Sequence, residues 1–493
     1  MRRLGTSEQK ENKMNPEFEL SLLNDFYEFT MSNGYFNEGK GEQIVYFDVF
    51  FRRIPDNGGY AVCCGLDQVI DYIANLSYSE ESVDFLRKKG IFSEGFLNYL
   101  RHFKFTCDVY AVPEGTPVFP GEPILTVRGP AIQAQLLETM ILLTLNHQSL
   151  IATKASRIVR AAEGRGVSEF GARRAHGTAA SVMGARAAYI AGCTGSSNTL
   201  CDKLYGVPSS GTMAHSWVQS FSSEYEAFEA YARNYPKACV LLIDTFNVLK
   251  SGLPNAIRCF NEVLAPLGCR PVAVRIDSGD ITYLSKKIRK VLDEAGYPDC
   301  KIMVSNSLDE YIIRDCIMQG AQIDLFGVGE RLITSRSESV FGGVYKLVAV
   351  ENGSGEIIPK IKISENIEKI TTPCFKQLYR FFSKESGMAI ADLITLHDEV
   401  IDETAPYTLF DPVHTWKEKV VTDFKAVPLL KPIFKHGKLV YQKPNTQEIR
   451  KYCLAQMDLL WDEVKRFENP HEFYVDYSLK LWTIKNELLQ KHD

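Results

Sequence analysis

The sequence contains no apolar run as long as the roughly 18 residues that a membrane-spanning helix needs. We therefore predict that no segment crosses a membrane. The first residues, MRRLGTSEQKENK, also lack the apolar core of a secretory signal. With neither a span nor a signal, the chain is expected to work in the cytoplasm.

Cysteine pairs with metal-ligand spacing are absent too. The 12 cysteines are scattered singly, apart from the adjacent Cys63 and Cys64, and no CxxC or Cys/His zinc pattern occurs. This excludes a zinc-binding scaffold. Scattered cysteines in a long chain without a secretory signal are typical of a reducing cytosol, which again favours the cytoplasm.

The chain also lacks a strong charge of either sign, since its formal net charge is −5 over 493 residues. Such a balance gives no general attraction to nucleic acid or to an anionic lipid surface, so we predict neither as a partner. An anionic ligand would need a local group of basic side chains. The length is sufficient for about two to four ordinary domains.

Four segments of different character divide the chain. Residues 1–13 are polar and predict a disordered N-terminal extension. Residues 14–150 mix helical and strand patterns and predict an α/β N-terminal domain, whereas 151–339 predict a separate catalytic domain. Residues 340–493 return to strands and end in helices. We expect them to pack on the N-terminal domain, with roughly 340–400 completing its strands.

The catalytic domain has a repeated strand-and-helix pattern. Short β-rich runs start about 20 to 31 residues apart and are each followed by a helical pattern, which is the spacing of βα units. Apolar runs such as VLLID and VAVRID are typical of strands buried on both faces of a parallel sheet. The runs are 167–170, 192–194, 211–214, 240–244, 272–276, 302–305 and 323–328. We predict an irregular (β/α) barrel of about seven parallel strands.

Residues suited to ligand binding lie at the carboxyl ends of these runs or directly after them, where parallel α/β domains place their sites. Arginines can fork onto phosphate or carboxylate, and loops of glycine and serine allow close approach of the backbone to phosphate. The residues concerned are Phe170, Arg173, Ser197, Thr212, His215, Arg275, Asp277, Ser305, Asn306, Gly327 and Gly329. Together they suit the handling of a phosphorylated sugar.

Simpler interpretations exist for several of these residues. His215 follows a loop of small residues, SSGTMA, and would lie beside an anion at a helix start, but it could equally be a capping or packing histidine. Asp277 and Asp280 suit ribose hydroxyls or a hydrated Mg²⁺, or else solvated helix caps. Arg173 could form a surface ion pair, and Ser197 could cap the helix that follows it.

Seven motifs in order resemble those of the nicotinate phosphoribosyltransferase family: NDFYEFTM, EFGARRAHG, GCTGSSN, GTMAHSW, VRIDSGD, VSNSLDE and FGVGERLIT. The resemblance runs from about residue 17 to at least residue 400. It implies a type II phosphoribosyltransferase-like fold. It also implies an enzyme of NAD synthesis that joins nicotinate to 5-phosphoribosyl 1-pyrophosphate, giving nicotinate mononucleotide and pyrophosphate, with coupled hydrolysis of ATP and a requirement for Mg²⁺ or Mn²⁺.

The resemblance further implies a pocket for the pyridine ring. Tyr27 and Phe170 would sandwich the ring, with Tyr27 coming from the partner subunit of a homodimer that shares its active sites. Arg275 would face the nicotinate carboxylate, with Thr212 in the same pocket. Ser197 would lie near the ring substituent, where relatives that use nicotinamide have an aspartate. A serine there favours the acid, because an aspartate would repel a carboxylate.

By the same resemblance, His215 is the catalytic residue that ATP phosphorylates, as a phosphohistidine. Asp277 is catalytic at the ribose, where its carboxylate would stabilise the cationic transition state. Arg173, Gly327 and Gly329 would hold phosphates, and Ser305 and Asn306 would lie near the ribose. The metal ligands are not implied, although Asp280 is a candidate for Mg²⁺.

One position departs from the family pattern. Glu330 stands where some relatives have threonine or glycine beside the phosphate, and an acid there would repel phosphate unless it paired with Arg331 or a metal. The alternatives are a nicotinamide phosphoribosyltransferase and a non-catalytic regulatory protein on the same fold. A quinolinate phosphoribosyltransferase would be much shorter, and an aldolase-type barrel would place a lysine at a strand end.

Overall fold

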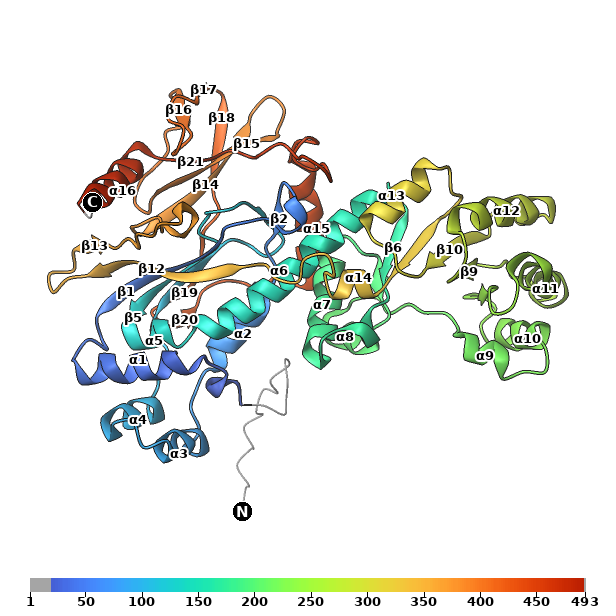
Figure 1. The fold of residues 1–493 in the computed structure, drawn as a ribbon, viewed down its shortest axis with the longest axis horizontal. Coiled ribbons are helices and arrows are strands. Elements are labelled where there is room, and N and C mark those ends of the chain that lie inside the picture. Colours follow the sequence, from blue (N-terminus) through green and yellow to red (C-terminus); the bar gives the residue numbers. More distant parts are fainter. Residues whose placement is uncertain (1–18, 492–493) are drawn as a thin grey trace, which may run out of the picture. The chain divides into compact units, whose positions relative to one another are not determined.

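The computed structural model describes residues 19–491, so the predicted disordered extension at 1–13 lies outside the described residues. The described chain forms two compact units (Figure 1). Unit 1 draws its residues from the segment ending at Ser149, from Val340–Pro444 and from Tyr452 onward, whereas unit 2 consists of Leu150–Ser339 and Asn445–Lys451. Each unit therefore combines segments that are far apart in the sequence.

Unit 1 contains an antiparallel sheet in which the strand β1 (Ile44–Phe51) has a partner on each side. One neighbour is β5 (Leu125–Pro130) and the other is β12 (Gly343–Glu351), with Val45 opposite Val350. The sheet order is β13-β12-β1-β5-β3-β19-β20. The other strands are β3 (Asp108–Ala111), β13 (Ile357–Pro359), β19 (Lys431–Lys435) and β20 (Lys438–Leu439). Strands from the last third of the chain thus complete a sheet that begins near its start.

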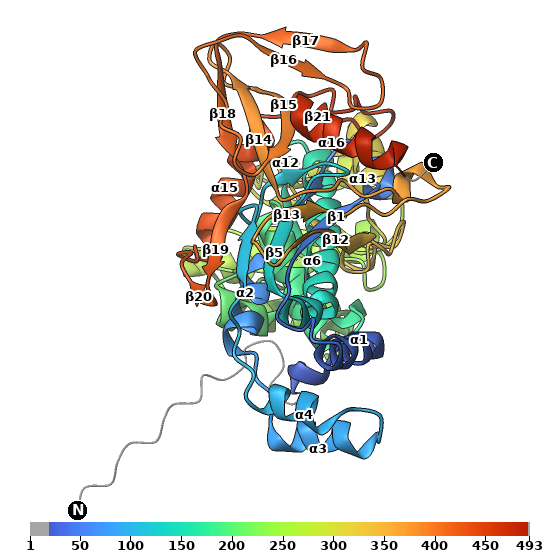
Figure 2. The same ribbon diagram turned by 90° about the vertical axis from the view of Figure 1, so that its left-hand side faces the viewer.

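A second sheet of unit 1 has the order β18-β14-β15-β21. Its strands are β14 (Lys376–Ser383), β15 (Ala389–Leu396), β18 (Phe424–Pro428) and β21 (Val475–Tyr477). The hairpin of β16 (Tyr407–Phe410) and β17 (Glu418–Val421) lies at one end of this sheet in both ribbon views (Figure 2). The short pair β2 (Ala61–Val62) and β4 (Pro117–Val118) also belongs to unit 1.

The helices of unit 1 begin where polar side chains satisfy their free backbone N–H groups. Asp25 and Glu28 form a capping box that starts α1 (Phe26–Asn37), and the hydroxyls of Ser79 and Ser93 cap α3 and α4. The helices are α1, α2 (Leu66–Asn75), α3 (Glu80–Lys88), α4 (Glu94–Arg101), α5 (Ala131–Gln135) and α16 (Leu479–Gln490). Two further helices, α6 (Glu138–Ala161) and α15 (Thr446–Asp458), span sequence boundaries between the units.

Unit 2 is built on a six-stranded sheet of order β7-β6-β11-β10-β9-β8, in which every pair of neighbours is parallel. The strands are β6 (Gly166–Glu169), β7 (Gly195–Ser196), β8 (Val240–Leu242), β9 (Ala273–Ile276), β10 (Lys301–Ser305) and β11 (Leu325–Val328). The predicted α/β class with a parallel sheet is therefore confirmed. Because all six strands run the same way, their carboxyl ends form one edge.

Two strand predictions need correction. The run predicted at 192–194 forms its strand slightly later, as β7, and the run at 211–214 is not a strand. Near the latter, Ser209 makes a single parallel bridge with Ser196. The Thr212 hydroxyl and the Met213 carbonyl then accept hydrogen bonds from the side chain of Arg275. Side-chain contacts have replaced the ladder that the short apolar run suggested.

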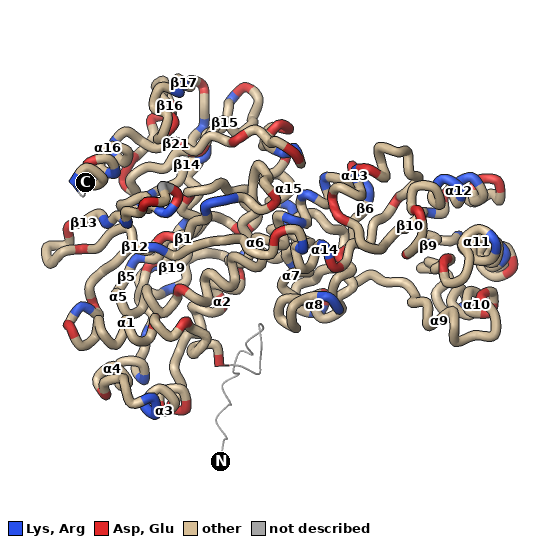
Figure 3. The backbone as a smooth tube through the Cα atoms, viewed as in Figure 1, with Lys and Arg blue, Asp and Glu red and all other residues tan. Residues whose placement is uncertain are grey.

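Helices follow the strands of unit 2 along the chain. They are α7 (Thr178–Ile190), α8 (Thr199–Tyr205), α9 (His215–Gln219), α10 (Glu224–Asn234), α11 (Leu253–Cys259), α12 (Ile281–Glu294), α13 (Glu310–Met318) and α14 (Glu330–Ile333). Acidic and basic residues are interspersed along both units, in agreement with the small net charge (Figure 3). Among the described residues, no helix is both long enough and apolar enough to cross a membrane.

Candidate active site

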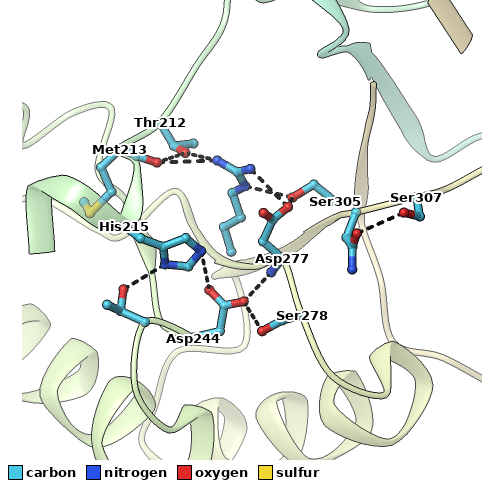
Figure 4. Close-up of polar contacts among 11 residues, drawn as sticks. Thr212, Met213, His215, Asp244, Asp277, Ser278, Ser305 and Ser307 are labelled. Carbon is cyan, nitrogen blue, oxygen red and sulfur yellow. Dashed lines mark hydrogen bonds and ion pairs between the residues drawn. The ribbon is translucent and has the colours of Figure 1, made fainter. Parts of the chain in front are cut away.

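The carboxyl edge of the parallel sheet brings together side chains from loops that are distant in sequence (Figure 4). Arg275 lies on β9 and its side chain is 16% exposed. Its Nη1 donates to the Thr212 hydroxyl at 2.8 Å, and its Nε donates to the Ser305 hydroxyl at 3.0 Å. The hydroxyl groups of Thr212 and Ser305 are neutral, so these two bonds leave most of the guanidinium charge uncompensated.

The carboxylate of Asp277 approaches Arg275 only loosely. Arg275 Nη2 lies 3.4 Å from Asp277 Oδ1, which also accepts a hydrogen bond from the Ser305 hydroxyl. The Asp277 side chain is 33% exposed, so it remains open to a ligand. Thr212, Arg275, Asp277 and Ser305, all predicted from the sequence as site residues, therefore form one polar cluster.

A buried carboxylate that we did not predict as a site residue holds the backbone of this cluster. Asp244 follows β8, and its side chain is 1% exposed. Its Oδ2 accepts the backbone N–H of Asp277 at 2.8 Å and the hydroxyl of Ser278 at 2.6 Å. Its Oδ1 has no hydrogen-bond partner in the described part of the chain. The sequence signal was its place at the end of a clear apolar strand.

His215 is the first residue of α9 and lies beside Asp244. Its Nδ1 is 3.1 Å from the Thr245 hydroxyl, and its Nε2 is 3.9 Å from Asp244 Oδ1. The His215 side chain is 40% exposed, whereas Asp244 is almost fully buried. The helix start has Ala214 at its cap position and no side-chain cap. His215 is thus oriented by two side-chain partners while part of its ring remains open to solvent.

Phe170 lies against glycines that admit no side chain. A Cβ atom on Gly327 would lie 2.6 Å from Phe170 Cδ2, and one on Gly329 would lie 3.3 Å from the Phe170 carbonyl oxygen. Arg275 also lies over the Phe170 ring, with its guanidinium carbon 5.7 Å from the ring centre. Phe170, Gly327 and Arg275 are therefore neighbours.

Ser197 and Arg173 are exposed on the loops that follow β7 and β6. Asn198, not Ser197, caps α8, because its side chain accepts the backbone N–H of Cys201 at 3.1 Å. The alternative role of Ser197 as a helix cap is therefore wrong. Arg173 lies in the short helix η3 (Ala172–Arg174) and has no ion-pair partner among residues 19–491.

Two residues beyond β10 have left-handed backbone angles. Asn306 has φ 94° and Ser307 has φ 43°, and the Ser307 hydroxyl donates to the Asn306 side chain at 3.1 Å. Such angles are costly for residues with a side chain and tend to cluster at functional sites. The turn directs the chain away immediately after Ser305, which holds Arg275.

Asp280 and Glu330 have simple structural partners. The Asp280 side chain caps α12 by accepting the backbone N–H of Tyr283 at 2.8 Å. Glu330 lies 3.6 Å from Arg336, not beside Arg331, which pairs with Asp309. Within the described chain, no group of three or more His, Cys, Asp or Glu side chains is arranged to hold a metal ion.

Tyr27 lies on α1, in unit 1, and is 43% exposed. Partial burial raises the pKa of its hydroxyl, and the neighbouring Glu138 carboxyl adds to that rise. Leu23, Phe26 and Met31 on and before the same helix are also exposed. A spacing of four residues places Tyr27 and Met31 on one face of the helix.

Comparison with known proteins identifies the family. Three family models match: the nicotinate phosphoribosyltransferase N-terminal domain over residues 22–146, the family itself over 166–387, and its C-terminal domain over 375–485. The nicotinate phosphoribosyltransferase of Bacillus subtilis is 42% identical, over 96% of this chain and 96% of that protein. The human enzyme is 31% identical, over 95% of this chain and 96% of that protein.

A solved structure shares the fold. The crystal structure of human nicotinic acid phosphoribosyltransferase matches with a TM-score of 0.82 at 29% identity, covering 95% of this chain and 100% of that chain. The type II phosphoribosyltransferase-like fold predicted from the motifs is thereby confirmed. The chain belongs to the nicotinate phosphoribosyltransferase family, and its function as an enzyme of that family, predicted from its motifs, is confirmed.

Proposed function

We propose that the cluster around Arg275 is the place where nicotinate is joined to 5-phosphoribosyl 1-pyrophosphate, giving nicotinate mononucleotide and pyrophosphate. The observation that carries this proposal is the under-compensated guanidinium of Arg275 beside the Phe170 ring. A guanidinium bound mainly to neutral hydroxyls can accept the nicotinate carboxylate, and an aromatic face suits the pyridine ring. Ser197 lies on the neighbouring loop as a neutral donor for the same carboxylate.

Asp277 supports the chemistry at the ribose. In the reaction the pyridine nitrogen forms a bond to the anomeric carbon while the bond from that carbon to pyrophosphate breaks. Positive charge develops on the ribosyl group, and a carboxylate held nearby stabilises it. Ser305 fixes Asp277 through its hydroxyl, and Asp244 fixes the Asp277 backbone. The Asp277 carboxylate is therefore positioned before the substrate binds.

Phosphate groups have several partners close to this cluster. Arg173 is exposed beside the end of β6, and Gly327 and Gly329, at the end of β11 and just after it, have no side chain of their own. Asn306 lies in the left-handed turn after Ser305. We assign Arg173 and the two glycines to the phosphates of the substrate, and Ser305 and Asn306 to the neighbourhood of the ribose.

A divalent cation fits the carboxylates of the cluster. Mg²⁺ on a substrate phosphate keeps several waters and needs only one or two protein carboxylates. The buried Asp244 Oδ1 lacks a hydrogen-bond partner among the described residues, and Asp277 is partly exposed. These two residues would hold Mg²⁺ or Mn²⁺, with Asp280 as a further candidate. When bound, the ion would neutralise charge on the departing pyrophosphate.

ATP is proposed to phosphorylate His215. With the Nδ1 proton donated to the Thr245 oxygen, Nε2 carries the lone pair that attacks the γ-phosphorus of ATP, and ADP leaves. Asp244 lies on the Nε2 side of the ring and would stabilise the positive charge that the imidazole gains. The support for this role is the combination of a partly exposed ring with two oriented partners.

The test of ATP coupling uses His215→Ala with γ-labelled ATP. We expect acid-labile label on the wild-type protein and none on the variant, which should lose stimulation by ATP but keep some transfer to nicotinate, because the ring and phosphate contacts remain. Labelling of another residue, or stimulation that survives the substitution, would contradict the proposal. Nicotinamide in place of nicotinate, with and without ATP, completes the assay.

A homodimer with shared active sites is proposed from α1. Phe26, Tyr27 and Met31 are exposed apolar or aromatic residues on one helix, which suits burial against a second subunit. Tyr27 would then stack on the ring in the partner's site. Mixing Tyr27→Ala protein with His215→Ala protein should restore part of the activity after subunit exchange. Exchange without restored activity would show that the sites are not shared.

The cytoplasm is proposed as the compartment. Most of the 12 cysteines are buried. Burial raises the pKa of the Cys201, Cys239 and Cys300 thiols to about 12, which keeps them protonated and unreactive. Cysteines that are scattered along the chain and mostly buried suit a reducing environment.

A further inference from the structure

A fully buried carboxyl group lies where two strand ends of unit 2 meet. Glu169 is the last residue of β6, is 0% exposed, and stands opposite Ser196, the last residue of β7, in parallel register. Phe170 follows Glu169 directly, and Ser197 follows Ser196. The two residues proposed to hold the pyridine ring and its carboxylate therefore come from positions next to this pair.

Both oxygens of the Glu169 side chain accept hydrogen bonds from the two strand ends. Oε2 accepts the hydroxyl of Ser196 at 2.6 Å, and Oε1 accepts the backbone N–H of Gly171, the residue after Phe170. The backbone carbonyl of Glu169 accepts the N–H of Ser197 at 2.8 Å. One residue thus restrains the chain on the far side of Phe170 and at Ser197 itself.

The hydrogen bonds continue from Ser196 back to the loop that carries Phe170. The Ser196 hydroxyl oxygen accepts the backbone N–H of Asn198 at 3.0 Å. The Asn198 side chain donates to the Ser181 hydroxyl at 2.9 Å, and that hydroxyl donates to the carbonyl of Ala172 at 3.2 Å. Ala172 begins η3. The series of bonds therefore connects Glu169, at the end of β6, with Ala172, three residues further along the chain.

Close packing prevents this region from adjusting easily. A Cβ atom on Gly171 would lie 2.7 Å from Glu169 Oε1 and 2.5 Å from Ile333 Cγ2. A Cβ atom on Gly327 would likewise lie 2.6 Å from Cδ2 of the Phe170 ring. In an interior packed at this density, a displaced carboxyl moves its neighbours instead of being absorbed by empty space.

The chemistry of the side chain explains why a carboxyl is present. Burial raises the pKa of Glu169, and the bonds from Ser196 and Gly171 act in the opposite direction. A carboxylate can accept a hydrogen bond at each oxygen, whereas a glutamine amide has one acceptor oxygen and must turn an NH₂ group toward the other donor. Glu169 has no exposed surface, so it cannot itself touch a substrate.

We propose that Glu169 is a positioning residue that fixes the aromatic face of Phe170 relative to Ser197, so that the pocket selects a flat ring carrying a carboxylate. This inference rests on the proposed function of Phe170 and Ser197. Glu169, Ser196, Asn198 and Ser181 carry the specificity indirectly, through the loops that they hold. A small misplacement of binding groups is sufficient to lose much of the rate.

The first test is Glu169→Gln in the full-length protein. We expect the KM for nicotinate to rise about 10- to 100-fold, and the kcat/KM ratio of nicotinate to nicotinamide to fall, since the pocket loses its fixed geometry. The KM for 5-phosphoribosyl 1-pyrophosphate should change much less. A merely structural role would instead lower the melting temperature and reduce activity with both pyridines equally, which would overturn the proposal.

Substitutions of Ser196 keep the test sharp if Glu169→Gln folds poorly. Ser196→Ala removes the donor to Oε2 and should reproduce the rise in KM, whereas Ser196→Thr retains a hydroxyl and should restore much of the wild-type value. Combining Glu169→Gln with Ser196→Ala should cost little more than the larger single change, because both act on the contact between Glu169 and Ser196. Additive losses would contradict the shared role.

Thr194→Val is the matched control. The Thr194 hydroxyl bonds to the Ser168 hydroxyl at 3.2 Å and to the Val167 carbonyl at 3.0 Å, so it joins the same two segments before the strand ends. Its loss should alter stability slightly and leave the ratio of the two pyridines unchanged. A change in that ratio as large as the one from Ser196→Ala would overturn the proposal. If the wild-type protein did not transfer the phosphoribosyl group to nicotinate, the proposed function itself would be contradicted.

Discussion

Two arginines, one in each unit, show how similar surroundings can serve different purposes. Arg380 lies on β14 and Arg275 on β9, and each lies over a phenylalanine ring, at 5.4 Å from Phe119 and 5.7 Å from Phe170. Arg380 is 1% exposed and holds both oxygens of a buried aspartate, Asp392, at 2.8 Å and 2.6 Å. Its charge is matched by a partner that belongs to the protein.

Arg275 lacks such a match. Its nitrogens bond to hydroxyls, its nearest carboxylate oxygen lies 3.4 Å away, and both it and that carboxylate are partly exposed. A buried charge without a close counter-ion is costly, so an arginine left in this state is ready for an external anion. The comparison indicates that Arg380 stabilises unit 1, whereas Arg275 is kept for a ligand.

The largest expected effect is that of Arg380→Leu on stability. Removing one partner of a buried ion pair leaves Asp392 charged and unpaired, which costs about 3–5 kcal/mol in the free energy of unfolding. Denaturant unfolding of the variant measures this loss. The double variant Arg380→Leu with Asp392→Leu should recover a large part of it, since Asp392 is then no longer left without its partner. Equal instability of single and double variants would contradict the pairing argument.

Arg275→Gln should act on activity and leave stability almost unchanged. The variant loses the charge that faces the nicotinate carboxylate, which costs about 2–5 kcal/mol, or roughly 30- to several-thousand-fold in kcat/KM for nicotinate. The free energy of unfolding should stay within about 1 kcal/mol of the wild type, because Asp277 is solvated. A loss of stability comparable to that of Arg380→Leu would remove the contrast between the two arginines.

The sequence was sufficient to predict most of this cluster because chain order and strand direction determine it. Phe170, Arg275, Asp277 and Ser305 each lie at the end of a clear apolar strand or just after it, and parallel strands bring such positions to one edge. Asp244 occupies an equally visible place, but its function depends on the backbone of Asp277 in the next strand. A contact between a side chain and a distant N–H group leaves no pattern in the sequence.

Other features were predicted wrongly or missed for related reasons. The short run at 211–214 has the composition of a strand, yet Thr212 and Met213 bond to Arg275 and no ladder forms. Ser197 and Asn198 are both good helix caps, and only the geometry decides for Asn198. Glu169 was not predicted as a site residue. Its proposed role depends on the strand register that places it opposite Ser196, and this register cannot be deduced from a single sequence.

Ser197→Asp tests whether the surroundings of Arg275 can be made more like those of Arg380. An added carboxylate near the ring substituent would repel nicotinate and could accept a hydrogen bond from the amide of nicotinamide. We expect the ratio of kcat/KM values to move toward nicotinamide by about tenfold or more, since Ser197 is exposed and part of the repulsion is screened. Ser197→Asn, which adds no charge, is the control. An unchanged ratio in a folded protein would leave the choice to Arg275 alone.

The smallest effect is expected at Asp280, a carboxylate near the cluster that the structure uses differently from Asp277. Its side chain accepts the N–H of Tyr283 at the start of α12, and asparagine is about as good a cap as aspartate. Asp280→Asn should therefore change the free energy of unfolding by only a few tenths of a kcal/mol, whereas Asp280→Ala should cost about 1 kcal/mol. The Mg²⁺ concentration needed for half-maximal activity separates a cap from a metal ligand. If it stays constant in Asp280→Asn, the residue only caps the helix. If it rises severalfold while stability is unchanged, Asp280 belongs with Asp244 and Asp277 among the groups that hold the ion.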